Sequence, residues 1–174
     1  MKNLLLPALL LASLTVSAQD LPQPSPKGKV EQVVGLTNIS VEYSRPSMKG
    51  RRIFGELVPF DKVWRTGANL NTMISFDGPV TIEGNEIAAG TYSVYTIPGQ
   101  EAWQFIFNKN IEGHGEDDRK DEGDVLRVKV PAGKSETFET LTFLFDSVKN
   151  DKAELQMRWE NTVVKVNIHA DATR

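Results

Sequence analysis

The stretch AELQMRWENTVVKVNI, residues 153–168, alternates apolar and polar side chains over most of its length. Its first half places an apolar residue at every second position, and the same spacing returns at Val164, Val166 and Ile168. Successive side chains of a β-strand point to opposite faces, so a period of two indicates a strand with one buried face. The stretch therefore predicts two short strands.

The same period occurs throughout the preceding hundred or so residues. The apolar positions with this spacing are Ile39, Val41 and Tyr43; Ile74 and Phe76; Val80 and Ile82; Trp103, Phe105 and Phe107; Leu126, Val128 and Val130; and Leu141, Phe143 and Phe145. Gly84-Asn85 is typical of a hairpin turn, and no run of ten residues shows helical periodicity, although residues 53–60 are compatible with one turn. The sequence predicts an all-β protein with little helix, an antiparallel β-sandwich of about nine or ten strands in jelly-roll or Greek-key order.

The N-terminal residues have the features of an export signal. Lys2 precedes a short Leu-rich run, and the small residues Val16, Ser17 and Ala18 follow it. This pattern predicts a signal peptide over residues 1–18. The apolar run is too short for a comfortable membrane span, and no later stretch approaches the roughly 20 apolar residues that a span needs. We expect no membrane span.

The remaining residues predict one domain with short extensions. Residues 19–29 form a Pro-rich polar lead, residues 30–169 a single β-sandwich domain, and residues 170–174 a flexible tail. The chain contains no cysteine, so it has neither a lipid-anchoring thiol nor a disulfide. An exported domain without disulfides predicts a periplasmic or secreted protein.

Charge is concentrated in one part of the chain, which we call the basic segment, residues 43–71. It holds six Lys and Arg residues against two acids, a net charge of +4. The whole chain carries -3, and removing the signal with Lys2 leaves -4, so everything outside the basic segment sums to -8. An acidic protein with one basic patch argues against nucleic-acid binding, but is compatible with a local anion site.

The candidate ligand-binding residues of the basic segment are Arg45, Arg51, Trp64, Arg65 and Asn69. Guanidinium groups bind carboxylates and phosphates through a fixed fork of donors, so an acidic sugar would suit them. The alternative is that the arginines bind backbone carbonyls and hold a long connection over an open end of the sandwich. Replacing Arg65 would abolish binding in the first case and lower stability in the second.

The three tryptophans have different expected roles. Trp103 and Trp159 share the spacing of the apolar strand positions, which predicts core residues. Trp64 lies in the loop-like VWRTGAN, residues 63–69, where no alternating partner explains it. Two interpretations remain for Trp64: it lines a pocket, or it closes one end of the sandwich.

The sequence offers little support for metal or catalytic chemistry. The acidic residues after His114 do not have the spacing of an EF-hand, so residues 111–123 predict a solvated, mobile loop and no calcium site. Cysteine and the G-x-S-x-G nucleophile motif are absent, and neither His lies near a serine in a recognisable arrangement. We name no catalytic residue and expect no cofactor.

Several short motifs carry a resemblance to a known family. They are Tyr43-Ser44-Arg45-Pro46, Gly50-Arg51, Ile53-Phe54-Gly55, residues 63–69, Ala89-Gly90, Tyr92-Ser93, Trp103, Ile106-Phe107-Asn108 and Asp124-Val125-Leu126-Arg127. From Pro24 to Ile168 the chain resembles the exported bacterial proteins known as domain of unknown function 2911. The resemblance implies a β-rich secreted or periplasmic domain and no established activity. Separately, Asp146-Ser147-Val148 is similar to an acceptor triplet of periplasmic O-glycosylation, which makes Ser147 a candidate modification site.

These observations favour a non-catalytic role at the basic segment. We expect binding of a small anionic or carbohydrate ligand, or of a protein partner in the cell envelope. Two alternatives remain open: an envelope enzyme that acts on glycans, and a structural component of the envelope. The enzyme would need acidic side chains beside the basic segment.

Overall fold

The computed structural model describes residues 22–172, and the predicted signal peptide lies outside them. These residues form nine strands, with every neighbouring pair antiparallel, and two short 3-10 turns. The strands are β1 (Lys27–Val34), β2 (Thr37–Ser44), β3 (Thr72–Phe76), β4 (Val80–Ile82), β5 (Asn85–Ile87), β6 (Gly90–Ile97), β7 (Ala102–Asn108), β8 (Asp124–Asp146) and β9 (Lys152–His169). The turns are η1 (Glu116–Asp118) and η2 (Asp121–Gly123). The all-β prediction is confirmed.

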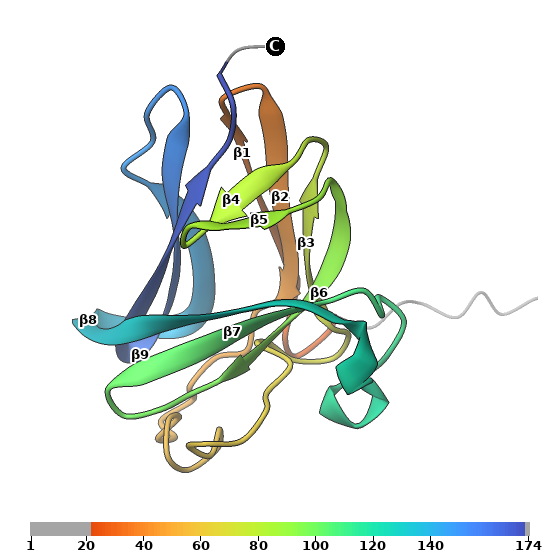
Figure 1. Cartoon of the computed structure of the whole chain (residues 1–174). Helices are drawn as coiled ribbons and strands as arrows, with labels where there is room; N and C mark the ends of the chain where they lie inside the picture. The colour runs from red at the N-terminus through yellow and green to blue at the C-terminus, as the bar shows by residue number, and fades with distance from the viewer. Residues whose placement is uncertain (1–21, 173–174) are drawn as a thin grey trace, which may run out of the picture.

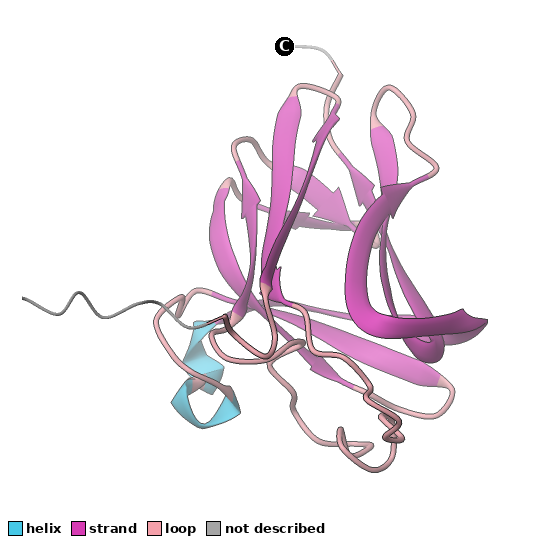
Figure 2. Ribbon diagram, turned by 180° about the vertical axis from the view of Figure 1, so that it is seen from behind, coloured by secondary structure: helices cyan, strands magenta, loops and turns pink. Residues whose placement is uncertain are grey.

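The strands form one open sheet in the order β1-β2-β3-β6-β7-β8-β9-β4-β5. The first half of β8 pairs with β7, whereas its second half pairs with β9, and the strand bends strongly between the two (Figure 2). The turn after β1 closes the other side, because Gly35 N–H donates to the Asn150 carbonyl and Leu36 N–H to the Asp171 carbonyl. The two halves of the sheet thus enclose one core, as in a β-sandwich (Figure 1).

The core is rich in aromatic side chains from both halves of the sheet. Trp103 of β7 and Trp159 of β9 are each 1% exposed, so their predicted core positions are confirmed. Phe54 contacts both indoles edge-on, with ring centroids 4.8 and 6.0 Å away. Such arrangements place ring edges on ring faces, which is favourable beyond the area they bury.

Residues at both ends of the predicted domain take part in the folded structure. β1 begins at Lys27, so residues 27–29 belong to the sheet and not to the Pro-rich lead. At the other end Ala170 is 1% exposed, and its N–H donates to the Asp151 carbonyl. Ala170, the first residue of the predicted tail, therefore completes the packing beside β9.

Residues 45–71 form the long connection between β2 and β3, which lies at one end of the sandwich (Figure 1). It touches the sheet through two isolated bridges, Ser47 with Thr140 and Trp64 with Thr96. The Glu160 carboxylate accepts hydrogen bonds from the Ile53 and Phe54 N–H groups at 3.3 and 3.2 Å. The connection is thus fixed to strands from both halves of the sheet, and it carries the candidate site.

Candidate functional site

Two of the candidate arginines donate to main-chain carbonyls. Arg45 Nε donates to the Leu141 carbonyl at 3.3 Å, and its Nη2 to Thr142 Oγ1 at 3.1 Å. Arg51 Nε and Nη2 donate to the carbonyls of Met48 and Ser47 at 2.9 and 2.8 Å. Both side chains therefore stabilise the connection, as one of the two interpretations of these arginines requires.

Arg65 joins the basic segment to the loop after β7. Its Nη1 donates to the Asn69 carbonyl at 3.0 Å and also to the His114 carbonyl, while its Nε lies 3.2 Å from Glu116 Oε2. The backbone of Gly115 passes directly over the guanidinium, where an added Cβ would lie 3.0 Å from Cζ. Gly115 also has a φ of +155°, so both space and backbone conformation favour glycine here.

Four of the five candidate residues meet at one pocket, which we call the arginine pocket. It has a volume of about 340 Å³, and Arg51, Trp64, Arg65 and Asn69 line it together with Glu116. Arg45 does not line it. Arg45 lies against β1 instead, where a Cβ added to Gly28 would come 2.7 Å from Arg45 Cδ.

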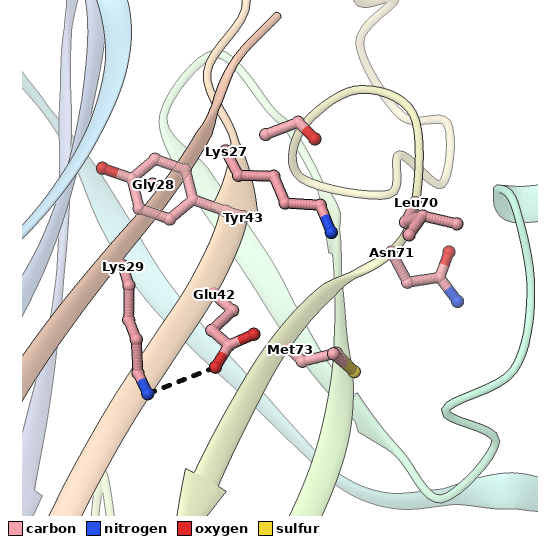
Figure 3. Close-up of a pocket in the computed structure, with 9 residues that line it drawn as sticks. Lys27, Gly28, Lys29, Glu42, Tyr43, Leu70, Asn71 and Met73 are labelled. Carbon is pink, nitrogen blue, oxygen red and sulfur yellow. Dashed lines mark ion pairs between the residues drawn. The ribbon is translucent and has the colours of Figure 1, made fainter. Parts of the chain in front are cut away.

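Two further pockets extend the arginine pocket along the molecule. A bridging pocket of about 490 Å³ shares Ser25, Arg65 and Asn69 with it. A lysine pocket of about 310 Å³ shares Lys27, Ser44 and Leu70 with the bridging pocket (Figure 3). We call the three together the basic groove.

The charged residues that line the basic groove leave it positive. The cations are Lys27, Lys29, Arg51 and Arg65, and the carboxylates are Glu42 and Glu116, so four charges against two leave +2. Lys29 lies 2.7 Å from Glu31 and 3.3 Å from Glu42, and hydrogen bonds to these two carboxylates raise its pKa. Lys27 has no such ion pair with another described residue.

Lys27 and Leu70 are two groove residues that the sequence did not reveal. Lys27 falls in the stretch predicted as a lead, and Leu70 is an isolated apolar residue with no periodic partner. In the structure Leu70 is 43% exposed, and Figure 3 shows the Lys27 side chain reaching across the lysine pocket toward it. Gly28 is a weak sign in the sequence that β1 lies beside the basic segment, because its lack of a side chain lets Arg45 pack against β1.

Trp64 both closes the sandwich and contributes to the arginine pocket. Its indole is 8% exposed and stacks on Trp159, with centroids 5.9 Å apart and planes 21° apart. Its Nε1–H donates to the Gly67 carbonyl at 3.1 Å. The ring therefore lies mainly in the core, and little of its face is available to a ligand.

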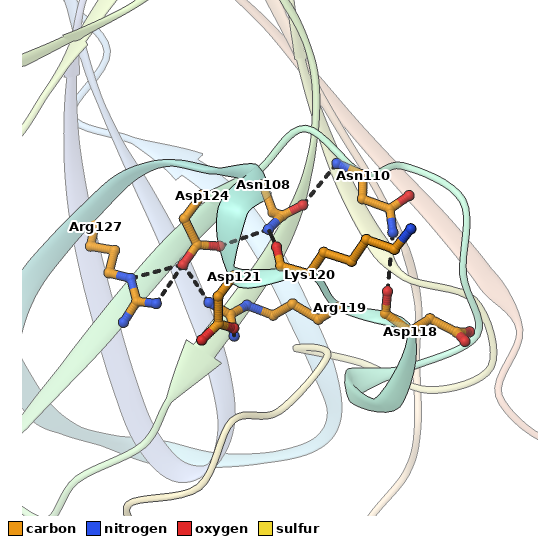
Figure 4. A network of polar contacts seen from close by, with 8 residues as sticks. All are labelled: Asn108, Asn110, Asp118, Arg119, Lys120, Asp121, Asp124 and Arg127. Atoms are coloured by element: carbon orange, nitrogen blue, oxygen red, sulfur yellow. Dashed lines mark hydrogen bonds and ion pairs between the residues drawn. The ribbon is translucent and has the colours of Figure 1, made fainter.

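A polar network holds the loop after β7 against the sheet (Figure 4). Asp124 Oδ2 accepts from Arg119 and from both Nε and Nη2 of Arg127, while Oδ1 accepts from Asn108 Nδ2 at 2.7 Å. The Arg119 side chain is only 7% exposed. This part of the predicted solvated loop is therefore packed on the protein, and it brings His114 and Glu116 to the groove.

The rest of the described chain offers no metal centre. Within residues 22–172, no group of three or more His, Cys, Asp or Glu residues is placed to hold a metal ion. Over the same residues, no helix is long and apolar enough to cross a membrane. Ser147 is exposed in the loop between β8 and β9, far along the chain from the basic segment.

Comparison with known proteins identifies a family. A family model described as "Protein of unknown function (DUF2911)" matches residues 25–168, which include the four candidate residues of the arginine pocket. No curated protein and no solved structure matches the chain. Because the matched region covers most of the chain, the protein belongs to the DUF2911 family of proteins of unknown function.

Proposed function

We propose that this protein binds a small anionic ligand in the basic groove. The observation that carries the proposal is the convergence of Arg51, Trp64, Arg65 and Asn69 on one pocket of about 340 Å³. Two adjoining pockets add Lys27, and the lining carries a net +2 in a chain whose net charge is -3. A local positive field in an acidic protein attracts anions specifically to this place.

The carbonyl contacts of the arginines are compatible with binding. A guanidinium has five N–H donors, and each of these arginines uses only part of its set on main-chain carbonyls. Those contacts fix the orientation of the remaining donors. A cation held in place before binding loses little conformational entropy when it meets an anion, which favours affinity.

Charge supports the proposal more strongly than aromatic stacking does. A neutral sugar would need an exposed ring face, and Trp64 places its face against Trp159. An acidic sugar or another carboxylate would use the arginines directly. The alternative of a glycan-acting enzyme has less support, because Glu116 is the one carboxylate among the described residues of the arginine pocket and glycosidases use two.

A ligand panel followed by thermal unfolding tests the proposal. We expect at least one of glucuronate, hexanoate and phosphate to raise the midpoint temperature of unfolding, because a ligand that binds the folded state stabilises it. Glucose should leave the midpoint unchanged. The stabilisation should weaken with added salt and disappear in Arg51→Ala. Arg52→Ala is the matched control, since Arg52 is exposed, pairs with Glu56 and does not line the groove. No shift with any anion would refute the proposal.

We also propose that the protein is exported to the periplasm or secreted, and that the signal peptide is cleaved after Ala18. The Leu-rich start of the chain supports this, and exposed Ser147 is the candidate for modification. The intact mass of the native exported protein should correspond to a chain that begins at Gln19. An additional mass that disappears in Ser147→Ala would establish the modification, and a bare chain would refute it.

A further inference from the structure

The contact between Arg65 and Glu116 indicates how the basic groove receives its ligand. Glu116 belongs to the loop after β7, and its carboxylate lies at the wall of the arginine pocket, 3.2 Å from Arg65 Nε. This separation is longer than the 2.7–2.9 Å or so of a charge-assisted hydrogen bond. The Arg65 and Glu116 side chains are 29% and 39% exposed, and exposed ion pairs of this kind contribute little to stability. An incoming anion can therefore displace Glu116 readily.

The rest of Arg65 would stay in place when Glu116 leaves. Nη1 remains bound to the Asn69 and His114 carbonyls, so the guanidinium keeps its orientation. The side of the group that carries Nε then faces the groove. Arginine binds carboxylates best through two parallel N–H donors, so a ligand carboxylate that takes the place of Glu116 can use a geometry the protein has already prepared.

The groove beside Arg65 also indicates what the ligand carries beyond its charged group. Leu70 is 43% exposed and lies in the wall shared by the bridging and lysine pockets. Tyr43 and Met73 line the lysine pocket on the other side of Leu70. An apolar body placed here would remove Leu70 from water, and apolar burial is favourable in proportion to the area covered.

Resting on the proposed function, we infer that Glu116 is a built-in competitor for Arg65 and that the ligand is a carboxylate with an apolar body. The ligand carboxylate replaces that of Glu116 at Arg65, and the apolar body extends along the groove over Leu70. The Glu116 side chain thereby acts as the gate to the binding site, while the loop that carries it stays held by the contacts of His114 and Asp118.

Calorimetric titration of the purified protein with hexanoate and acetate tests this inference. We expect hexanoate to bind about tenfold more tightly than acetate, because part of its chain is buried. Glu116→Gln should bind hexanoate about two- to five-fold more tightly than the unaltered protein, because an exposed ion pair no longer competes. Glu112→Gln is the matched control: Glu112 is exposed in the same loop and lines no described pocket of the groove, so it should not change affinity.

A second pair of variants tests the apolar part of the inference. Leu70→Ser should reduce the preference for hexanoate over acetate, whereas Leu36→Ser, which alters a similarly exposed leucine outside the groove, should leave it unchanged. Unchanged or weaker binding in Glu116→Gln, or no preference for hexanoate, would overturn the inference while leaving the proposed function intact. No binding of any anion by the protein or by Glu116→Gln would refute both.

Discussion

At the scale of single residues, Asp124 is a nearly buried carboxylate that pairs with two arginines. Its side chain is 9% exposed, and it compensates Arg119, whose side chain is 7% exposed, while also pairing with Arg127. A buried cation without a partner is strongly unfavourable. The main role of the Asp124 carboxylate is therefore to neutralise the charge of Arg119.

Asp124→Asn should lower the free energy of unfolding by about 3 kcal/mol, because it leaves the buried Arg119 with only the solvent-exposed carboxylate of Asp121 as its ion-pair partner. Chemical denaturation measures the change. Asp121→Asn is the matched control, since Asp121 also pairs with Arg119 but is 76% exposed, and its loss should cost under about 1 kcal/mol. Equal losses in the two variants would contradict the assignment.

Tyr95 predicts a dependence of stability on alkaline pH. Burial raises the pKa of its phenol above the ordinary value of 10.0, against the opposing effects of the Asn71 hydrogen bond and the Arg119 charge. The folded protein thus holds this proton more tightly than the unfolded chain does. The stabilisation is fully present below about pH 10 and is lost as the pH rises through the pKa of the folded state.

The free energy of unfolding should therefore fall more steeply above about pH 10 in the unaltered protein than in Tyr95→Phe, which has no phenol to ionise at this position. Denaturation series at neutral and alkaline pH measure both slopes. Identical slopes in the two proteins would show that Tyr95 does not contribute.

The burial of single residues could be predicted from the sequence where they belong to a pattern of alternating apolar residues. Trp103 and Trp159 have a spacing of two from other apolar residues, and both are buried. The partners of Arg45 and Arg65 could not be predicted in the same way. They are carbonyls of β8 and of the loop after β7, and only the path of the folded chain brings those groups near.

At the scale of secondary-structure elements, β8 and β9 are longer than the sequence pattern indicates. Pro131 and Gly133 interrupt the alternation in β8, and Glu160-Asn161 does so in β9, so each strand was predicted as two. Both continue through the interruption, with register shifts between Lys134 and Thr142. Local irregularities let a strand bend without ending, which carries it from one half of the sandwich to the other.

Glu160 links this bend to the long connection between β2 and β3. Glu160→Ala should lower the free energy of unfolding by about 1–3 kcal/mol, because the Ile53 and Phe54 N–H groups lose a charged acceptor. Denaturant titration measures the loss. Glu136→Ala should change stability by less than about 0.5 kcal/mol, since Glu136 is 77% exposed and 3.7 Å from its ion-pair partner. If Glu160→Ala left the free energy of unfolding unchanged, the connection would be held without this contact.

At the scale of the whole molecule, charge is separated between the groove and the remaining surface. The groove lining carries +2 although the chain carries -3, so positive potential is concentrated where the basic segment meets β1. The sequence predicted the basic half of this surface from the arginines. It could not predict the contribution of β1, because Lys27 reaches the groove only through the pairing of β1 with β2.

A comparison of Arg45 with Arg65 distinguishes a structural role of the arginines from a role in binding. Arg45 and Arg65 both donate to the main chain, but only Arg65 lines the groove. The most direct test of the anion-binding proposal is the affinity of Arg45→Ala and Arg65→Ala for an anion that stabilises the unaltered protein, measured by calorimetry beside their stabilities. We predict that both variants are less stable and that only Arg65→Ala loses binding, by at least about tenfold. Equal affinities in the two folded variants would contradict the proposal and leave the arginines a structural role alone.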